Sequence, residues 1–120
     1  MEKFTVLIES RPFCAFDNTP MEQLEGSGMD LVDMRGSGVQ DPEFVKALNQ
    51  VDAILCGNDL VVNDAVLDMA PRVKAIAKMG AGLDTVDIAA ATRHNAVVFH
   101  TPGANNQAVA DHTFGLILNV

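Results

Sequence analysis

The chain has 120 residues, a length that suits one domain with a single hydrophobic core. Its 48% hydrophobic and 20% charged residues are typical of a soluble globular protein, and its formal charge of −8 disfavours nucleic acids and anionic membranes as partners. No apolar run approaches the roughly 18 residues of a membrane span, and the first residues lack the basic start and apolar run of a signal peptide. A cytoplasmic location is therefore expected.

The cysteines and histidines do not indicate a metal or nucleophile site. Cys14 and Cys56 are far apart and lack the C-x-x-C spacing, so we expect a loop thiol and a buried apolar side chain, with no disulfide. No cluster of His, Cys, Asp or Glu has zinc or iron spacing, and no Ser-His-Asp or Cys-His set is visible. The sequence predicts no metal.

The first half of the chain predicts two strands, each followed by a helix. An apolar strand is expected over residues 4–9, ended by Pro12, and a helix begins near Pro20 with Thr19 as its cap and stops at residues 26–28. Residues 29–34 alternate polar and apolar side chains, which indicates a half-exposed edge strand. Asp41 followed by Pro42 is a favourable helix start.

The second half repeats the alternation with more strongly apolar strands. Continuous apolar runs predict buried strands over residues 52–56, 73–77 and 96–99. Helices are expected over residues 63–70, after Asp87, and from about Ala108. Strict alternation of strand and helix is the signature of a parallel sheet with right-handed crossovers. We therefore predict an α/β fold, a flavodoxin-like three-layer sandwich whose five parallel strands are ordered 2-1-3-4-5.

Two loops rich in Gly, Asn and Thr follow the fourth and fifth predicted strands. In open α/β sheets ligands bind at the carboxyl ends of the strands, so residues 78–87 and 101–106 form a site hypothesis. Glycines at 80 and 82 would bring backbone N–H groups close to a carboxylate or phosphate, and Asn105 adds a side chain that can donate and accept. The alternative for the first loop is a tight turn without a ligand. Arg11 at the same edge could also hold an anion, although a solvated arginine is the more common finding.

Three segments together make the chain resemble a known family. Residues 74–87 read KAIAKMGAGLDTVD, residues 96–105 read AVVFHTPGAN, and residues 108–112 read AVADH. In this order and spacing they resemble the D-isomer-specific 2-hydroxyacid dehydrogenases, which include phosphoglycerate, D-lactate, glyoxylate and formate dehydrogenases. The match covers about the last 50 residues, and the earlier part agrees only in its rhythm of strands and helices.

The resemblance implies how the chain is organised. Residues 1–104 would be the substrate-binding domain, and residues 105–120 a helix leading to an NAD-binding Rossmann domain that lies beyond Val120 and binds NAD or NADP. The backbone N–H groups of Ala81 and Gly82 match the position that holds the substrate carboxylate, and Asn105 matches an asparagine that points into the cleft. Lys78 stands at a strand end where many members have a basic residue; a solvated lysine is the alternative.

The same resemblance limits what this chain can do alone. The family's catalytic arginine, its acidic partner and its histidine relay belong to or lie near the nucleotide domain, so no catalytic or cofactor-binding residue is expected here and the fragment should be inactive. His112, beside Asp111, is expected to pack at a helix or domain interface, and Asp84 and Asp87 to organise the turn and cap a helix. His94 is expected at a helix C-terminus and His100 at a strand end. We expect the full-length protein to be a homodimer.

The loop at residues 80–85 also looks like a dinucleotide fingerprint, but two elements are missing. Thr85 stands where the third glycine should be, and the region about 20 residues on contains His100 and Thr101 in place of an acidic residue. We therefore do not predict the NAD site there.

Two functions remain. The favoured one is the substrate-binding part of an NAD(P)-dependent oxidoreductase that interconverts a D-2-hydroxy acid and its 2-keto acid, with phosphoglycerate dehydrogenase as a candidate. The alternative is a stand-alone flavodoxin-like binding or signalling module, such as a receiver domain. A receiver needs a lysine before Pro102, where Thr101 stands, and an acidic cluster that is here reduced to Glu9.

Overall fold

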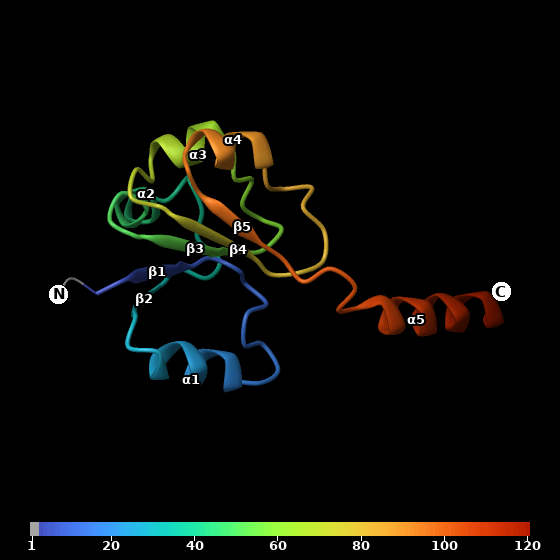
Figure 1. Cartoon of the computed structure of the whole chain (residues 1–120). Coiled ribbons are helices and arrows are strands. Elements are labelled where there is room, and N and C mark those ends of the chain that lie inside the picture. The colour runs from blue at the N-terminus through green and yellow to red at the C-terminus, as the bar shows by residue number, and fades with distance from the viewer. Residues whose placement is uncertain (1–2) are drawn as a thin grey trace.

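A computed structural model describes residues 3–120, and its centre is a parallel sheet of five strands (Figure 1). The strands are β1 (Thr5–Ile8), β2 (Asp30–Asp33), β3 (Ala53–Cys56), β4 (Ala75–Lys78) and β5 (Val97–Phe99). Their order in the sheet is β2-β1-β3-β4-β5, and every neighbouring pair is parallel. The predicted fold class and strand order are confirmed.

The helices lie on both sides of this sheet. They are α1 (Thr19–Gly26), α2 (Pro42–Leu48), α3 (Asp64–Asp68), α4 (Ile88–Arg93) and α5 (Asn106–Leu118). Figure 1 shows α2, α3 and α4 on one face and α1 on the other, near β1 and β2, while α5 extends away from the sheet. None of the helices in the described part of the chain is long and apolar enough to cross a membrane.

Three of the predicted helix starts are confirmed by side-chain caps. The carboxylate of Asp41 accepts the Glu43 N–H at 2.9 Å before α2, and the Asp87 carboxylate accepts from the N–H of Ala90, also at 2.9 Å, before α4. Asn63 caps α3 in the same way. These polar side chains satisfy N–H groups that the first helical turn leaves unpaired.

The start of α1 differs from the prediction. Thr19 is the first helical residue, and Asn18 occupies the N-cap position without a side-chain bond. The carboxylate of Asp17 accepts hydrogen bonds from the backbone N–H and the hydroxyl of Thr19, at 3.1 and 2.8 Å. The local bond of an aspartate two residues earlier thus replaces the cap predicted for Thr19.

The hydrophobic core lies between the sheet and helices α2, α3 and α4. Leu7, Ile54 and Ile76 are side by side in the register of β1, β3 and β4, and each is fully buried. Phe44 and Leu48 of α2 pack against this row and are also fully buried. Alternate residues of each strand face this core, as expected from the two-residue repeat of a strand.

The opposite face of the sheet is open over its β4–β5 side. Leu55, Ala77 and Phe99 lie in one row of the register, and Phe99 is 59% exposed. Val97, the other residue of β5 on this face, is 57% exposed. The prediction that residues 96–99 form a buried strand is therefore wrong for this face, because β5 is an edge strand and only its other face is covered by a helix.

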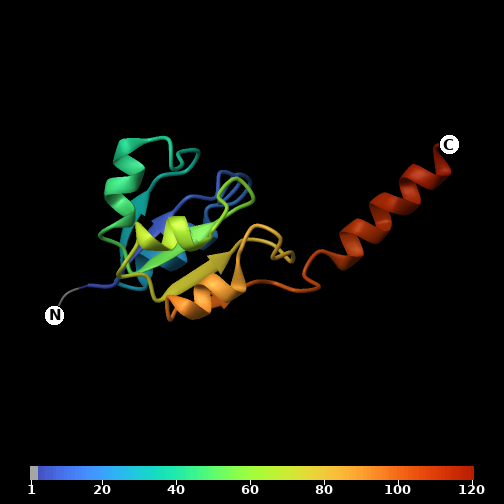
Figure 2. The same ribbon diagram turned by 90° about the horizontal axis from the view of Figure 1, so that it is seen from above.

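Helix α5 stands apart from the domain, as the view in Figure 2 makes clear. It begins at Asn106, two residues before the predicted start at Ala108. Its exposed apolar side chains are Val109, Phe114, Leu116, Ile117 and Leu118. Among the described residues, the hydrophobic core thus contains no side chain of α5.

Candidate functional site

The loop after β4 presents unpaired N–H groups at the carboxyl edge of the sheet. Within residues 3–120, the backbone N–H groups of Gly80, Ala81 and Gly82 have no acceptor. Gly80 has φ +127°, a conformation that side chains rarely adopt, whereas φ of Gly82 is not in this range. Since Gly82 is exposed and Ala81 half-exposed, these N–H groups can reach an anion from solvent.

The carbonyl groups of the same loop are held by the connection after β5. The Gly80 oxygen accepts from the Thr101 N–H at 3.0 Å, and His100 Nδ1 lies 2.8 Å from the Ala81 oxygen. A carbonyl can only accept, so His100 carries its proton on Nδ1 in this contact. The sequence indicated only a strand end for His100; the structure adds it as a residue that orients the loop.

Lys78 is buried beneath the loop and is not a solvated lysine. Lys78 is the last residue of β4 and is 5% exposed. Its Nζ donates to Asn58 Oδ1 at 2.6 Å and to the backbone carbonyl oxygen of Met79 at 3.3 Å. A Cβ atom added at Gly80 would lie 3.7 Å from Nζ. The ammonium is therefore directly next to the loop that carries the unpaired N–H groups.

The end of β1 holds the two neighbouring loops. The carboxylate of Glu9 accepts from the Gly57 N–H at 2.9 Å, and the Ser10 hydroxyl donates to the sulfur of Met79 at 3.1 Å. Glu9 and Ser10 are 1% and 0% exposed. Burial raises the pKa of Glu9, and the nearby Asp59 carboxylate adds to this, while the Gly57 hydrogen bond opposes it.

The sequence did not indicate that Glu9 and Ser10 hold the loops next to β4. Two polar residues at the end of an apolar strand are their only local signal. Gly57 completes the contact, since a Cβ atom there would lie 2.9 Å from the Ser10 hydroxyl oxygen. A glycine at this position lets β1 and the loop after β3 approach closely.

Asn105 lies on the connection between β5 and α5. It occupies the N-cap position of α5, is exposed, and makes no side-chain cap bond. No hydrogen bond joins it to Lys78, Ala81 or Gly82 in the described part of the chain. The structure thus brings three of the four predicted substrate-binding residues together and leaves the fourth on the connection to α5.

Three other residues singled out from the sequence, Arg11, His94 and His112, are not part of the loop after β4. Arg11 is exposed and its Nε lies 3.7 Å from an Asp59 carboxylate oxygen. His94 ends α4, with Nε2 3.2 Å from Asp64 Oδ1. His112 is exposed on α5, so the packing expected for it is not formed within residues 3–120.

The cysteines also match their expected environments. Cys56 is fully buried, and burial raises the pKa of its thiol to about 11, so the reactive thiolate is scarce at neutral pH. Cys14 is half-buried in a loop and has φ 61°. Both thiols are free. Across residues 3–120, no three His, Cys, Asp or Glu side chains gather in a way that could hold a metal ion.

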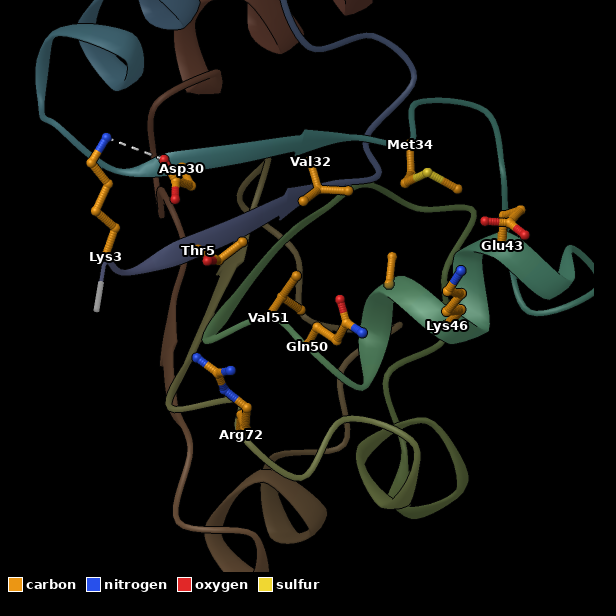
Figure 3. A pocket seen from close by; sticks show the side chains of 11 residues that line it. Lys3, Thr5, Asp30, Val32, Met34, Glu43, Lys46, Gln50, Val51 and Arg72 are labelled. Atoms are coloured by element: carbon orange, nitrogen blue, oxygen red, sulfur yellow. Dashed lines mark hydrogen bonds and ion pairs between the residues drawn. The ribbon is translucent and has the colours of Figure 1, made fainter. Parts of the chain in front are cut away.

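A larger groove lies elsewhere, between β2 and α2 (Figure 3). Its volume is about 630 Å³, and charges of both signs line it, with Lys3 3.4 Å from the Asp30 carboxylate. Arg72 at its other end binds the Asp52 carboxylate. None of the residues predicted from the sequence lines this groove. We place the site at the loop after β4 because unpaired donors and a buried cation converge there, and size alone indicates no chemistry.

These features define a parallel α/β domain in which backbone N–H groups without an acceptor and a buried lysine lie at the carboxyl edge of the sheet. The profile described as "D-isomer specific 2-hydroxyacid dehydrogenase, catalytic domain" matches residues 11–115. The chain therefore belongs to the D-isomer-specific 2-hydroxyacid dehydrogenase family, and the receiver-like alternative is set aside.

Curated relatives agree with this assignment. A glyoxylate reductase of Thermofilum pendens is 40% identical over 78 residues, which cover 65% of this chain and 23% of the relative. A D-3-phosphoglycerate dehydrogenase of Mycobacterium leprae is 34% identical over 90 residues, which cover 74% of this chain and 17% of the relative. The chain thus spans less than a quarter of the length of these relatives.

Solved structures show the same fold. A protein of Thermus thermophilus superposes with a TM-score of 0.82 at 27% identity, over 96% of this chain and 36% of that protein. A D-lactate dehydrogenase of Aquifex aeolicus, solved with NAD and lactic acid, superposes with a TM-score of 0.77 at 25% identity. That match covers 94% of this chain and 32% of the enzyme.

Proposed function

We propose that residues 1–104 are the substrate-binding part of an NAD(P)-dependent oxidoreductase that interconverts a D-2-hydroxy acid and its 2-keto acid. Helix α5, within residues 105–120, then leads to a nucleotide-binding domain. The observation that carries the proposal is the set of unpaired N–H groups at Ala81 and Gly82, next to the buried ammonium of Lys78. The relatives named glyoxylate reductase and D-3-phosphoglycerate dehydrogenase support this class of substrate.

The site would hold the substrate by its carboxylate. The N–H groups of Ala81 and Gly82 donate to the carboxylate oxygens, and the Lys78 ammonium stabilises their negative charge. Asn105, whose side chain makes no cap bond, can donate to the same ligand from the connection to α5. Binding by the carboxylate fixes the orientation of C2, the carbon that is oxidised or reduced.

The residues of this chain do not fit a dinucleotide. Thr85 replaces the third glycine of the fingerprint, and no acidic residue stands where the ribose would be held. In the proposed enzyme NAD or NADP, which exchanges a hydride with C2, is bound by the domain that follows. The proposal includes a homodimer and a cytoplasmic location. It also means that this chain alone oxidises no hydroxy acid, and turnover by the purified chain would refute that part.

Amide NMR of the chain tests the site without needing catalysis. We expect D-lactate and glyoxylate to shift the amide resonances of residues 80–82 in a saturable way, because these N–H groups become hydrogen-bonded. Lactamide, which has the shape of lactate without its charge, is the matched control and should have little effect. Equal shifts with lactamide, or no response at residues 80–82, would refute the proposed site.

Kinetics of the full-length enzyme give a second test. Asn105→Ala should raise the KM for the hydroxy or keto acid, because one hydrogen bond worth about 0.5 to 1.5 kcal/mol is lost, and should leave the KM for NAD nearly unchanged. Gly82→Val should cause a larger loss by placing a branched side chain beside the ligand. A greater effect on NAD would mean that the loop serves the cofactor.

A further inference from the structure

The buried ammonium of Lys78 has unusual partners. Both of its hydrogen-bond acceptors, Asn58 Oδ1 and the Met79 carbonyl, are neutral. Among the described residues no carboxylate lies within ion-pair distance of Nζ, and the buried Glu9 carboxylate interacts with the ammonium only at longer range. Buried lysines are normally paired with an acid, since burial of a charge without compensation is costly. An apolar side chain would fill this place at lower cost, so the positive charge itself calls for an explanation.

We propose that Asn58 is a positioning residue that holds the Lys78 ammonium against the substrate loop while leaving its charge available for the substrate anion. This rests on the function proposed above. A carboxylate at position 58 would hold Nζ equally well, but it would neutralise the ammonium. An amide oxygen directs one N–H bond of Lys78 and leaves the net charge in place.

The surrounding contacts keep Asn58 in position. Asn58 itself is exposed, but the preceding residue, Gly57, donates its N–H to the buried carboxylate of Glu9. The next residue, Asp59, lies 3.7 Å from Arg11. The Gly57 hydrogen bond thus fixes the backbone directly before Asn58, whose amide oxygen lies 2.6 Å from Nζ, while the exposed Asp59–Arg11 pair adds little.

The exchange Asn58→Asp separates this role from a purely structural one. The side chains have the same shape, and an aspartate would form an ion pair with Lys78, so folding stability should be unchanged or higher. We expect the affinity for D-lactate, followed by the NMR shifts of residues 80–82, to fall about tenfold because a negative charge now stands several ångströms from the ligand carboxylate. A structural role alone predicts no loss of binding.

Two further variants complete the experiment. Asn49→Asp adds the same charge at the C-cap of α2, away from the loop, and should leave binding unchanged. Asn58→Leu removes the acceptor without adding charge, and should weaken binding less than Asn58→Asp does while lowering stability more. If Asn58→Asp binds D-lactate like the unmodified chain, the role assigned to Asn58 is refuted and the proposed function stands. If the unmodified chain itself fails to bind, both are overturned.

Discussion

Replacing Glu9 tests whether its hydrogen bond with the Gly57 N–H stabilises the loop after β3. In the unmodified chain the Gly57 N–H donates to the Glu9 carboxylate at 2.9 Å. Glu9→Gln removes the charge but keeps an oxygen that can accept this hydrogen bond. Glu9→Leu keeps a similar volume and leaves the Gly57 N–H without its acceptor. A buried N–H group without a partner costs about 1 to 3 kcal/mol, and we expect the free energy of unfolding of the Leu variant to lie below that of the Gln variant by this amount at every pH.

The pH dependence gives an independent measure of the same group. Burial raises the pKa of Glu9 above 4.5, so the folded chain favours the protonated carboxyl. The associated stability is present below pH 4.5 and is lost as the pH rises through the folded-state pKa. The Gln variant cannot ionise, so its stability relative to the unmodified chain should increase with pH over this window.

Urea unfolding between pH 4 and pH 8 measures both effects. The difference between the unmodified chain and Glu9→Gln isolates Glu9, because the other titrating groups are common to both proteins. A difference that does not change with pH would contradict the raised pKa. A Gln variant as unstable as the Leu variant would show that the Gly57 hydrogen bond is not what Glu9 contributes.

Three further predictions concern other parts of the chain. Gly80→Ala should lower the free energy of unfolding by about 1 to 3 kcal/mol, because φ of +127° is strained for a side chain, and calorimetry should detect it. Asp52→Ala should lower the free energy of unfolding by about 2 kcal/mol, because the carboxylate accepts hydrogen bonds from the Thr5 N–H and from Arg72. These bonds lower the pKa of Asp52, so its contribution to stability is present above pH 3.8 and is lost as the pH falls through the lowered pKa. Measuring stability during an acid titration tests this. Phe114→Glu should change the stability of the sheet domain by less than about 0.5 kcal/mol and reduce self-association at high concentration in sedimentation experiments, because α5 exposes its apolar side chains.

The parts of the fold that follow from short-range patterns were predictable. Alternating strands and helices indicated a parallel sheet, and the chain length and the family resemblance favoured its strand order. The caps at Asp41 and Asp87 follow from bonds to N–H groups only two or three residues away. Ala81 and Gly82 lie in the loop after β4, as expected for a glycine-rich segment that follows a parallel strand, and their role as substrate ligands stays a prediction.

The parts that depend on distant contacts were not predictable. Nothing near Lys78 in the sequence indicates that Asn58 will bind its buried ammonium, and the contact between Glu9 and Gly57 is equally remote. The exposure of β5 follows from its position at the edge of the sheet and from the absence of a covering helix in the described residues. The placement of α5 away from the sheet could not be obtained from its apolar sequence, which would suit a packed helix equally well.

The central position of β1 has a consequence for the order of folding. This strand comes first in the chain, yet it pairs with β2 on one side and with β3 on the other. Glu9 and Ser10 at its end bind partners 48 and 69 residues further on. Closing such long loops costs chain entropy before any contact repays it, and folding dominated by distant pairings is slow. During refolding, secondary structure should therefore appear before the contacts of Glu9 and Ser10 form.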